Sequence, residues 1–132
     1  MLLILGCFMS LTVSAKDKPD TLADSYYRGD GLGYNVSLVL ETNGEYRAWW
    51  DGCLGRYGTA KGYWKAKSGK VELNPSEEID MMKGHLRILN IRKIDGRFEL
   101  LPEEDEKRMK TEEEKRMFSF TKIDRREKAS HQ

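Results

Sequence analysis

The chain has 132 residues, with 23 basic and 22 acidic side chains and a formal net charge of +1. This length suits one domain with a modest core, and the balanced charge argues against nucleic acid as a partner, because nucleic-acid binders concentrate basic residues on one surface. Two cysteines and two histidines offer few candidates for disulfides, metal ligands or nucleophiles.

A mostly apolar run from Leu2 to Val13 opens the chain and predicts an export signal. It ends in Val13-Ser14-Ala15, a cleavage site of small residues, and it is too short to span a bilayer as a helix. We therefore expect residues 1–15 to be a signal peptide and residues 16–23 a flexible leader. The mature protein would then be periplasmic or extracellular.

Lipidation is the alternative reading of the same segment. Ile4-Leu5-Gly6-Cys7 resembles the lipobox of bacterial lipoproteins, in which the cysteine carries the lipid. A lipid on Cys7 would anchor the protein to a membrane. Because few residues precede Cys7, we favour cleavage after Ala15.

Residues 24–123 are expected to form a single β domain, which begins with a strand from Asp24 to Arg28. The centre of this domain, from Gly29 to Pro75, contains all three tryptophans and reads as four short strands in a meander. Ser76-Glu77-Glu78 is expected to begin a helical turn or a loop that ends this meander.

The first central hairpin can be predicted at the level of register. Apolar residues alternate with polar ones from Val36 to Leu40 and again from Tyr46 to Trp50. A three-residue loop, Thr42-Asn43-Gly44, pairs Leu40 with Tyr46 and Val36 with Trp50, whereas a two-residue loop would pair apolar residues with polar ones. The three-residue loop requires a left-handed glycine at position 44.

Two further hairpins have the signature of tight two-residue turns, Ser68-Gly69 and Asp95-Gly96. The expected pairs are Trp64 with Leu73 for the first turn and Ile91 with Leu100 for the second. The strand before Asp95 has apolar residues on both parities between His85 and Ile94. Either it is buried on both faces, or a bulge near Leu89 changes the parity.

The segment from Glu103 to Arg116 predicts one charged helix, since acidic residues precede basic ones by four positions. It has almost no apolar face, so we expect it to be solvated. Residues 117–123 are a plausible last strand with Phe118 and Phe120 on one face, and residues 124–132 are expected to be a disordered tail.

These elements predict an all-β protein, mainly an antiparallel meander, of seven to eight strands with one short charged C-terminal helix. A strongly curved sheet or a small barrel fits short turns between successive strands. A two-sheet sandwich is the alternative.

A glycine and aromatic pattern runs through the central strands. Its parts are Gly29-Asp30-Gly31, Gly33-Tyr34-Asn35, Asn43-Gly44, Trp50, Gly52-Cys53-Leu54-Gly55, Tyr57-Gly58, Gly62-x-Trp64 and the closing Asp95-Gly96-Arg97-Phe98. This pattern resembles a family of small, uncharacterised bacterial exported β-rich proteins, and the resemblance covers roughly residues 25–102. More distantly, the Gly-x-Trp strand and the meander resemble lipocalin-type barrels. The resemblance implies a β-barrel and export but no activity.

No catalytic, metal or cofactor site emerges from the residue pattern. The glycine-rich run Gly29 to Gly33 lacks the Lys-Ser/Thr of a phosphate loop and is read as a turn. Cys53 is expected to be buried and inert, because no pattern links it to a base such as His85. We therefore expect no cofactor and no enzyme.

The exposed aromatic residues are the strongest candidates for partner binding. The register places Tyr46, Trp50 and Trp64 inward, and it places Trp49 and Tyr63 outward beside Arg47. The leading hypothesis is an exported binding module for a small apolar ligand. The alternative is an interaction or inhibitor module that presents Trp49, Tyr63 and Arg47 to an envelope protein.

Overall fold

The computed structural model describes residues 21–29 and 34–123. The signal peptide predicted at 1–15, the start of the leader at 16–20 and the tail predicted at 124–132 lie outside the described residues.

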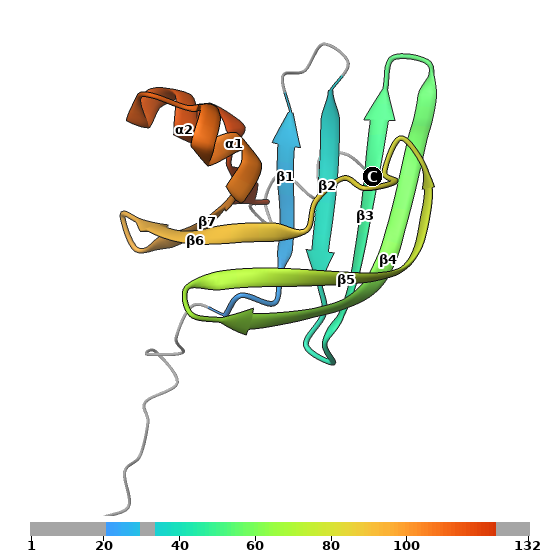
Figure 1. Ribbon diagram of the computed structural model, residues 1–132, viewed down its shortest axis with the longest axis horizontal. Coiled ribbons are helices and arrows are strands. Elements are labelled where there is room, and N and C mark those ends of the chain that lie inside the picture. The colour runs from blue at the N-terminus through green and yellow to red at the C-terminus, as the bar shows by residue number, and fades with distance from the viewer. Residues whose placement is uncertain (1–20, 30–33, 124–132) are drawn as a thin grey trace, which may run out of the picture.

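Eight antiparallel strands form a closed barrel in which each strand pairs with the next along the chain (Figure 1). The strands are β1 (Ser25–Gly29), β2 (Asn35–Leu40), β3 (Glu45–Gly52), β4 (Gly55–Lys67), β5 (Lys70–Asp80), β6 (Ile88–Ile94), β7 (Arg97–Pro102) and β8 (Phe120–Lys122). The short strand β8 closes the barrel because it pairs with both β7 and β1. The predicted all-β meander barrel is confirmed, and the sandwich alternative is wrong.

The predicted register of the first central hairpin is confirmed. Leu40 pairs with Tyr46 and Val36 pairs with Trp50. Gly44 has a φ of +89°, a conformation that favours glycine. The loop therefore closes as the sequence predicts.

The two tight turns also have the predicted geometry. Trp64 pairs with Leu73 across the first turn, and Ile91 pairs with Leu100 across the second. Ser68 and Gly69 have φ values of 53° and 74°, and Asp95 and Gly96 have values of 51° and 78°. Positive φ at both central residues is the mark of a type I′ turn, which matches the twist of the flanking strands.

The turn expected at Ser76–Glu78 is wrong, since β5 continues through Pro75 to Asp80. The strand absorbs the proline with a β-bulge. Gly62 of β4 faces Pro75, whereas Lys61 faces Glu77, so Ser76 is the extra residue.

The apolar residues on both parities before Asp95 are explained by neither of the two expected arrangements, a strand buried on both faces or a bulge near Leu89. Strand β6 begins only at Ile88, and Leu86 lies outside it with a φ of +62°. This left-handed residue lets Leu86 be buried without belonging to the ladder, while Leu89 is fully buried inside the strand. Neither two-sided burial nor a bulge near Leu89 is needed.

The charged C-terminal segment forms two short helices rather than one, α1 (Glu103–Arg108) and α2 (Glu112–Phe118). The first ends at Met109, whose backbone is extended. The second begins with a capping box, in which the Thr111 side chain accepts from the Glu114 N–H and the Glu114 carboxylate accepts from the Thr111 N–H. Phe118 ends α2, so the last strand is shorter than the predicted 117–123.

Packed side chains fill the barrel interior. Its fully buried large side chains include Tyr26, Val36, Leu38, Leu40, Tyr46, Val71, Leu89, Leu100 and Phe120. Trp50 and Trp64 are partly buried and pack against this core, as their inward parity predicts. The barrel therefore has a solid centre, and space for a ligand has to be sought at its ends or on its outside.

Candidate binding site at the helix-covered end of the barrel

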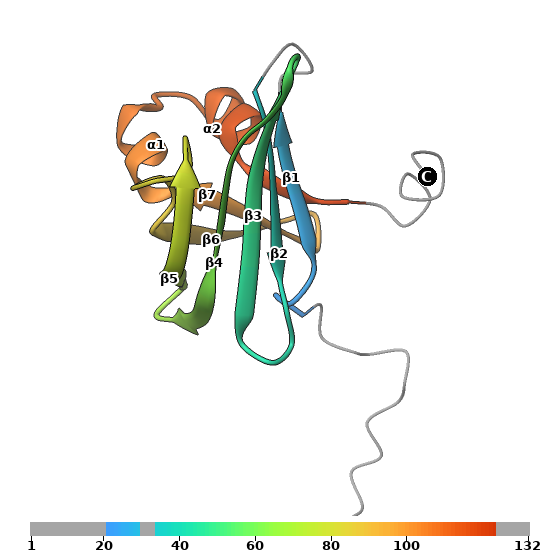
Figure 2. The same cartoon turned by 90° about the vertical axis from the view of Figure 1, so that its right-hand side faces the viewer.

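The two helices lie over one end of the barrel, on the same side as the β3–β4 turn (Figures 1 and 2). A hollow of about 530 Å³ opens there between β1 and the helices. Its lining includes Arg28, Tyr34, His85, Asp105, Met117 and Phe118. A volume of this size is in the range of small-molecule sites.

Strand register assembles the floor of this hollow. Arg28 of β1 pairs with Val36 of β2, and Val36 pairs with Trp50 of β3, so the three residues form one row across neighbouring strands. Tyr34 precedes β2 and has the same parity as Val36. Polar and aromatic side chains thus meet where the apolar core ends.

An ion pair almost fully removed from water links β1 to α1. Arg28 Nη1 lies 2.7 Å from Asp105 Oδ2, and the two side chains are 7% and 10% exposed. Arg108 Nη2 donates a second hydrogen bond to the same carboxylate, at 2.7 Å from Oδ1. The charged segment was expected to be solvated and only lightly docked, yet its first helix contributes a buried acid.

Arg28 also joins the end of α2 to the barrel. Its Nη1 donates to the backbone carbonyl of Phe118 at 3.1 Å. Its guanidinium lies 5.0 Å from the ring centre of Tyr34 and 5.4 Å from that of Phe120. Cation–π attraction at such distances helps to hold a desolvated arginine.

Tyr34 and His85 continue the polar network. Arg28 Nη2 donates to the Tyr34 hydroxyl at 2.7 Å, and that hydroxyl lies 3.1 Å from His85 Nε2. Burial lowers the pKa of His85, and the neighbouring Arg28 lowers this pKa further. Burial raises the pKa of Tyr34, with a smaller opposing effect of Arg28. Both groups are therefore neutral near pH 7, and the Tyr34 O–H can donate to the imidazole.

Trp50 packs against two residues of the floor, although it does not itself line the hollow. It stacks on His85 with the ring centres 5.6 Å apart and meets Tyr34 edge to face at 4.7 Å. Two buried donors of this cluster, Trp50 Nε1 and Arg28 Nε, have no hydrogen-bond partner. Such groups are rare in folded proteins because each costs its lost hydration.

The wall formed by α2 is apolar and open to water. Met117 is 70% exposed and Phe118 is 38% exposed. No residue of α2 is buried. The hollow therefore combines an apolar wall with a polar floor, an arrangement that can bind an amphipathic molecule.

The site contains no recognisable set of reacting groups. Its histidine is held by Tyr34 and Trp50, and the described residues that line the hollow include no serine, threonine or cysteine. In the part of the chain that the structure describes, no group of three or more His, Cys, Asp or Glu residues is placed to hold a metal ion. Cys53 is exposed in the β3–β4 turn, so the expectation that it is buried is wrong.

The partner-binding residues predicted from the sequence lie on the outer face of β3 and β4. Trp49 and Arg47 line a hollow of about 390 Å³, and Arg47 and Tyr63 line a second one of about 310 Å³. Tyr63 is 60% exposed, and Arg56 lies over the Trp49 ring at 5.5 Å. The structure brings the three residues onto one face, but none of them lines the hollow beneath the helices.

Comparisons with known proteins add no family: no family model, curated protein or solved structure matches the chain. The fold and the site therefore define only a class, a small eight-stranded antiparallel β-barrel with a partly polar hollow at one end. Neither helix in the described ranges is long and apolar enough to cross a membrane.

Proposed function

We propose that this protein is an exported, non-catalytic binding module that holds a small apolar or amphipathic ligand at the helix-covered end of its barrel. The observation that carries this proposal is the hollow of about 530 Å³ beside exposed Met117 and Phe118, above a packed barrel core. Ligand sites are commonly concave and mostly apolar, with a few placed polar groups.

Because the interior is packed, we place the ligand site at the end of the barrel rather than at its centre. Side chains as large as Tyr26, Tyr46 and Phe120 fill the inner face. Met117 and Phe118, in contrast, expose apolar surface next to an existing hollow. A ligand that covers them removes this surface from water, which is favourable in proportion to the area covered.

Export remains part of the proposal. It rests on the apolar segment that ends in Val13-Ser14-Ala15 and on the resemblance of the glycine and aromatic pattern to small bacterial exported proteins. The distant resemblance of the meander to lipocalin-type barrels is likewise part of the proposal. A periplasmic or extracellular location follows from cleavage after Ala15, and a membrane-anchored one follows from a lipid on Cys7.

The test is saturable binding of a neutral fluorescent probe, N-phenyl-1-naphthylamine. We expect Met117→Asp to weaken probe binding by about tenfold, since it places a charge on the apolar wall. Leu54→Asp is the matched control, because Leu54 is 93% exposed in the β3–β4 turn and does not line the hollow. No saturable binding by the parent protein, or equal losses in both variants, would overturn the proposal.

A second candidate function uses the outer face of β3 and β4 to bind an envelope protein. The observation that favours it is the pair of adjacent hollows lined by Arg47, with Trp49 at one and Tyr63 at the other. Exposed aromatic residues and arginine are enriched in binding hot spots. Capture of a specific envelope protein by the parent, lost in Trp49→Ala, is the expected result, and an empty capture by the parent contradicts it.

A further inference from the structure

Among its described lining residues, the hollow beneath the helices has more positive than negative side chains. Arg28 and Arg108 both bind the single carboxylate of Asp105, and these three are the charged residues of that described lining. His85 is neutral because burial and Arg28 lower its pKa. Glu104, on the same helix, does not line this hollow but lines a neighbouring one, which shares His85, Asp105 and Arg108 with it. In the part of the lining that the structure describes, two guanidinium groups and one carboxylate give a formal charge of +1.

Hydrogen bonding at this end points in the same direction. The two charged side chains that line the hollow beside Asp105, Arg28 and Arg108, carry only hydrogen-bond donors. Arg28 is itself only 7% exposed and lines the hollow. A ligand that brings acceptor oxygens therefore suits these two arginine side chains, whereas one that brings further donors does not.

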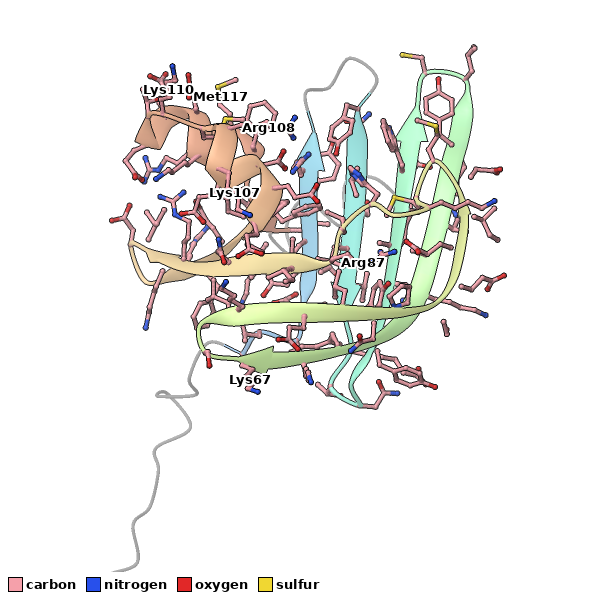
Figure 3. The ribbon with its side chains drawn as sticks, viewed as in Figure 1. Lys67, Arg87, Lys107, Arg108, Lys110 and Met117 are labelled. Atoms are coloured by element: carbon pink, nitrogen blue, oxygen red, sulfur yellow. The ribbon has the colours of Figure 1, made fainter. Side chains whose placement is uncertain are left out.

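Arg108 is the cation that a ligand reaches first. Its side chain is 71% exposed, and its bond to Asp105 uses Nη2 alone. In Figure 3 it lies near Met117 at the top of the helical segment, whereas Lys107 lies lower on the same helix. An anionic group at Arg108 can thus be continued by an apolar body lying against Met117 and Phe118.

From this arrangement we infer that the ligand of the end site is an organic monoanion, an apolar body that carries one carboxylate-like group bound by Arg108. The inference rests on the proposed binding function and adds the chemical class of the ligand. Arg28 acts as a positioning residue that holds Asp105, and through it Arg108, at the rim of the hollow. A planar guanidinium is well suited to a carboxylate, because it can donate two parallel hydrogen bonds.

The experiment compares three probes that share an eight-carbon chain and differ only in the head group. Octanoate, 1-octanol and octylammonium each compete with bound N-phenyl-1-naphthylamine near neutral pH. We expect octanoate to displace the fluorescent probe at a concentration about tenfold lower than octanol does, with octylammonium the weakest competitor.

Variants of two neighbouring basic residues show which of them causes the preference for octanoate. Arg108→Gln should remove the advantage of octanoate over octanol while changing the octanol midpoint by less than about twofold. Lys107→Gln is the matched control, since it removes the same charge from the adjacent, exposed residue that does not line the hollow. It should leave the preference for octanoate intact.

The outcomes separate this inference from the function on which it rests. Equal displacement by octanoate and octanol would overturn the anion preference and leave the apolar site standing. Equal loss of the preference in Lys107→Gln and Arg108→Gln would overturn the role of Arg108, because it would show a diffuse effect of charge. No saturable probe binding by the parent protein would overturn the proposed function and this inference together.

Discussion

Arg28 and Asp105 carry opposite charges in surroundings that water barely reaches, since their side chains are 7% and 10% exposed. Removing one partner of such a pair leaves the other charge buried without compensation. We expect Asp105→Asn to lower the free energy of unfolding by about 3–5 kcal/mol in urea titrations. Arg108→Gln, in a side chain that is 71% exposed, should cost less than about 1 kcal/mol. Similar small losses in both variants would contradict the buried pair.

His85 gives the same cluster a dependence on pH. Its pKa is lowered by burial and by Arg28, with Asp105, Glu104 and Glu78 opposing this shift. Between the lowered folded-state pKa and the unfolded value of about 6.5, the unfolded chain binds more protons. Stability must therefore fall as the pH drops below about 6.5 and through the folded-state pKa.

The measurement for His85 is the urea midpoint between about pH 7.5 and pH 5.5. We expect the decline on acidification to be shallower in His85→Gln, which retains a side chain that can accept a hydrogen bond from Tyr34. The pKa of Glu78 is also lowered, through its bond to Arg87, but that group titrates below the range of the test. Identical pH profiles for parent and variant would refute a neutral, buried His85.

Trp49 and Trp50 are neighbours on opposite faces of β3. Trp50 contacts Tyr34 and His85 and packs against the core, so Trp50→Ala should cost about 3–5 kcal/mol of unfolding free energy. Trp49 lies on the outer face, where Trp49→Ala should cost less than about 1 kcal/mol. Denaturant midpoints decide between this contrast and an outer face as tightly packed as the inner one, which equal losses would indicate.

At the scale of single residues, the sequence predicts which face of a strand a side chain occupies better than it predicts which distant side chain it contacts. The alternation in β3 predicts that Trp50 points inward, and the structure agrees. The link between Arg28 and Asp105 spans 77 positions, and nothing local distinguishes this acid from the others in α1. The parity of Arg28 with the inward Tyr26 was the one available signal, and charged residues on an inner face are too rare to be expected.

A substitution at Gly62 tests the β-bulge between strands β4 and β5. A Cβ atom at this position would lie 2.2 Å from the backbone oxygen of Asn74, far inside contact distance. Gly62→Ala should therefore force the backbone of β4 and β5 apart, at a cost of about 1–3 kcal/mol. Lys61→Ala, at the adjacent outward position, should be nearly neutral in the same urea titration. An unaffected Gly62→Ala would show that β5 does not approach β4 as described.

Local chemistry explains which elements could be predicted. Turn residues such as Asn43-Gly44 and Asp95-Gly96 mark the hairpins, and the apolar alternation on both sides selects loop length and register, so three hairpins follow from the sequence. Pro75 misleads because proline usually ends a strand, whereas here the bulge at Ser76 accommodates it. The break between α1 and α2 did have a signal, the capping-box pair Thr111 and Glu114.

For the whole molecule, the division between a packed centre and a hollow end decides where function is sought. Alternating apolar residues predict a curved sheet or a small barrel, and large inward aromatics leave little room inside a small barrel. The hollow at the end depends on how α1 and α2 pack onto the barrel, through Arg28, Asp105 and the Phe118 carbonyl. That packing is non-local and follows from no repeat or turn in the sequence.

The most direct test of this account is an NMR titration of the isotope-labelled protein with 1-octanol, followed through the backbone amides. The account predicts saturable shifts that cluster at the helix-covered end, at Arg28, Tyr34, His85, Arg108, Met117 and Phe118, with the outer face of β3 and β4 unchanged. Shifts centred instead on Arg47, Trp49 and Tyr63, or no saturable shifts at all, would contradict it.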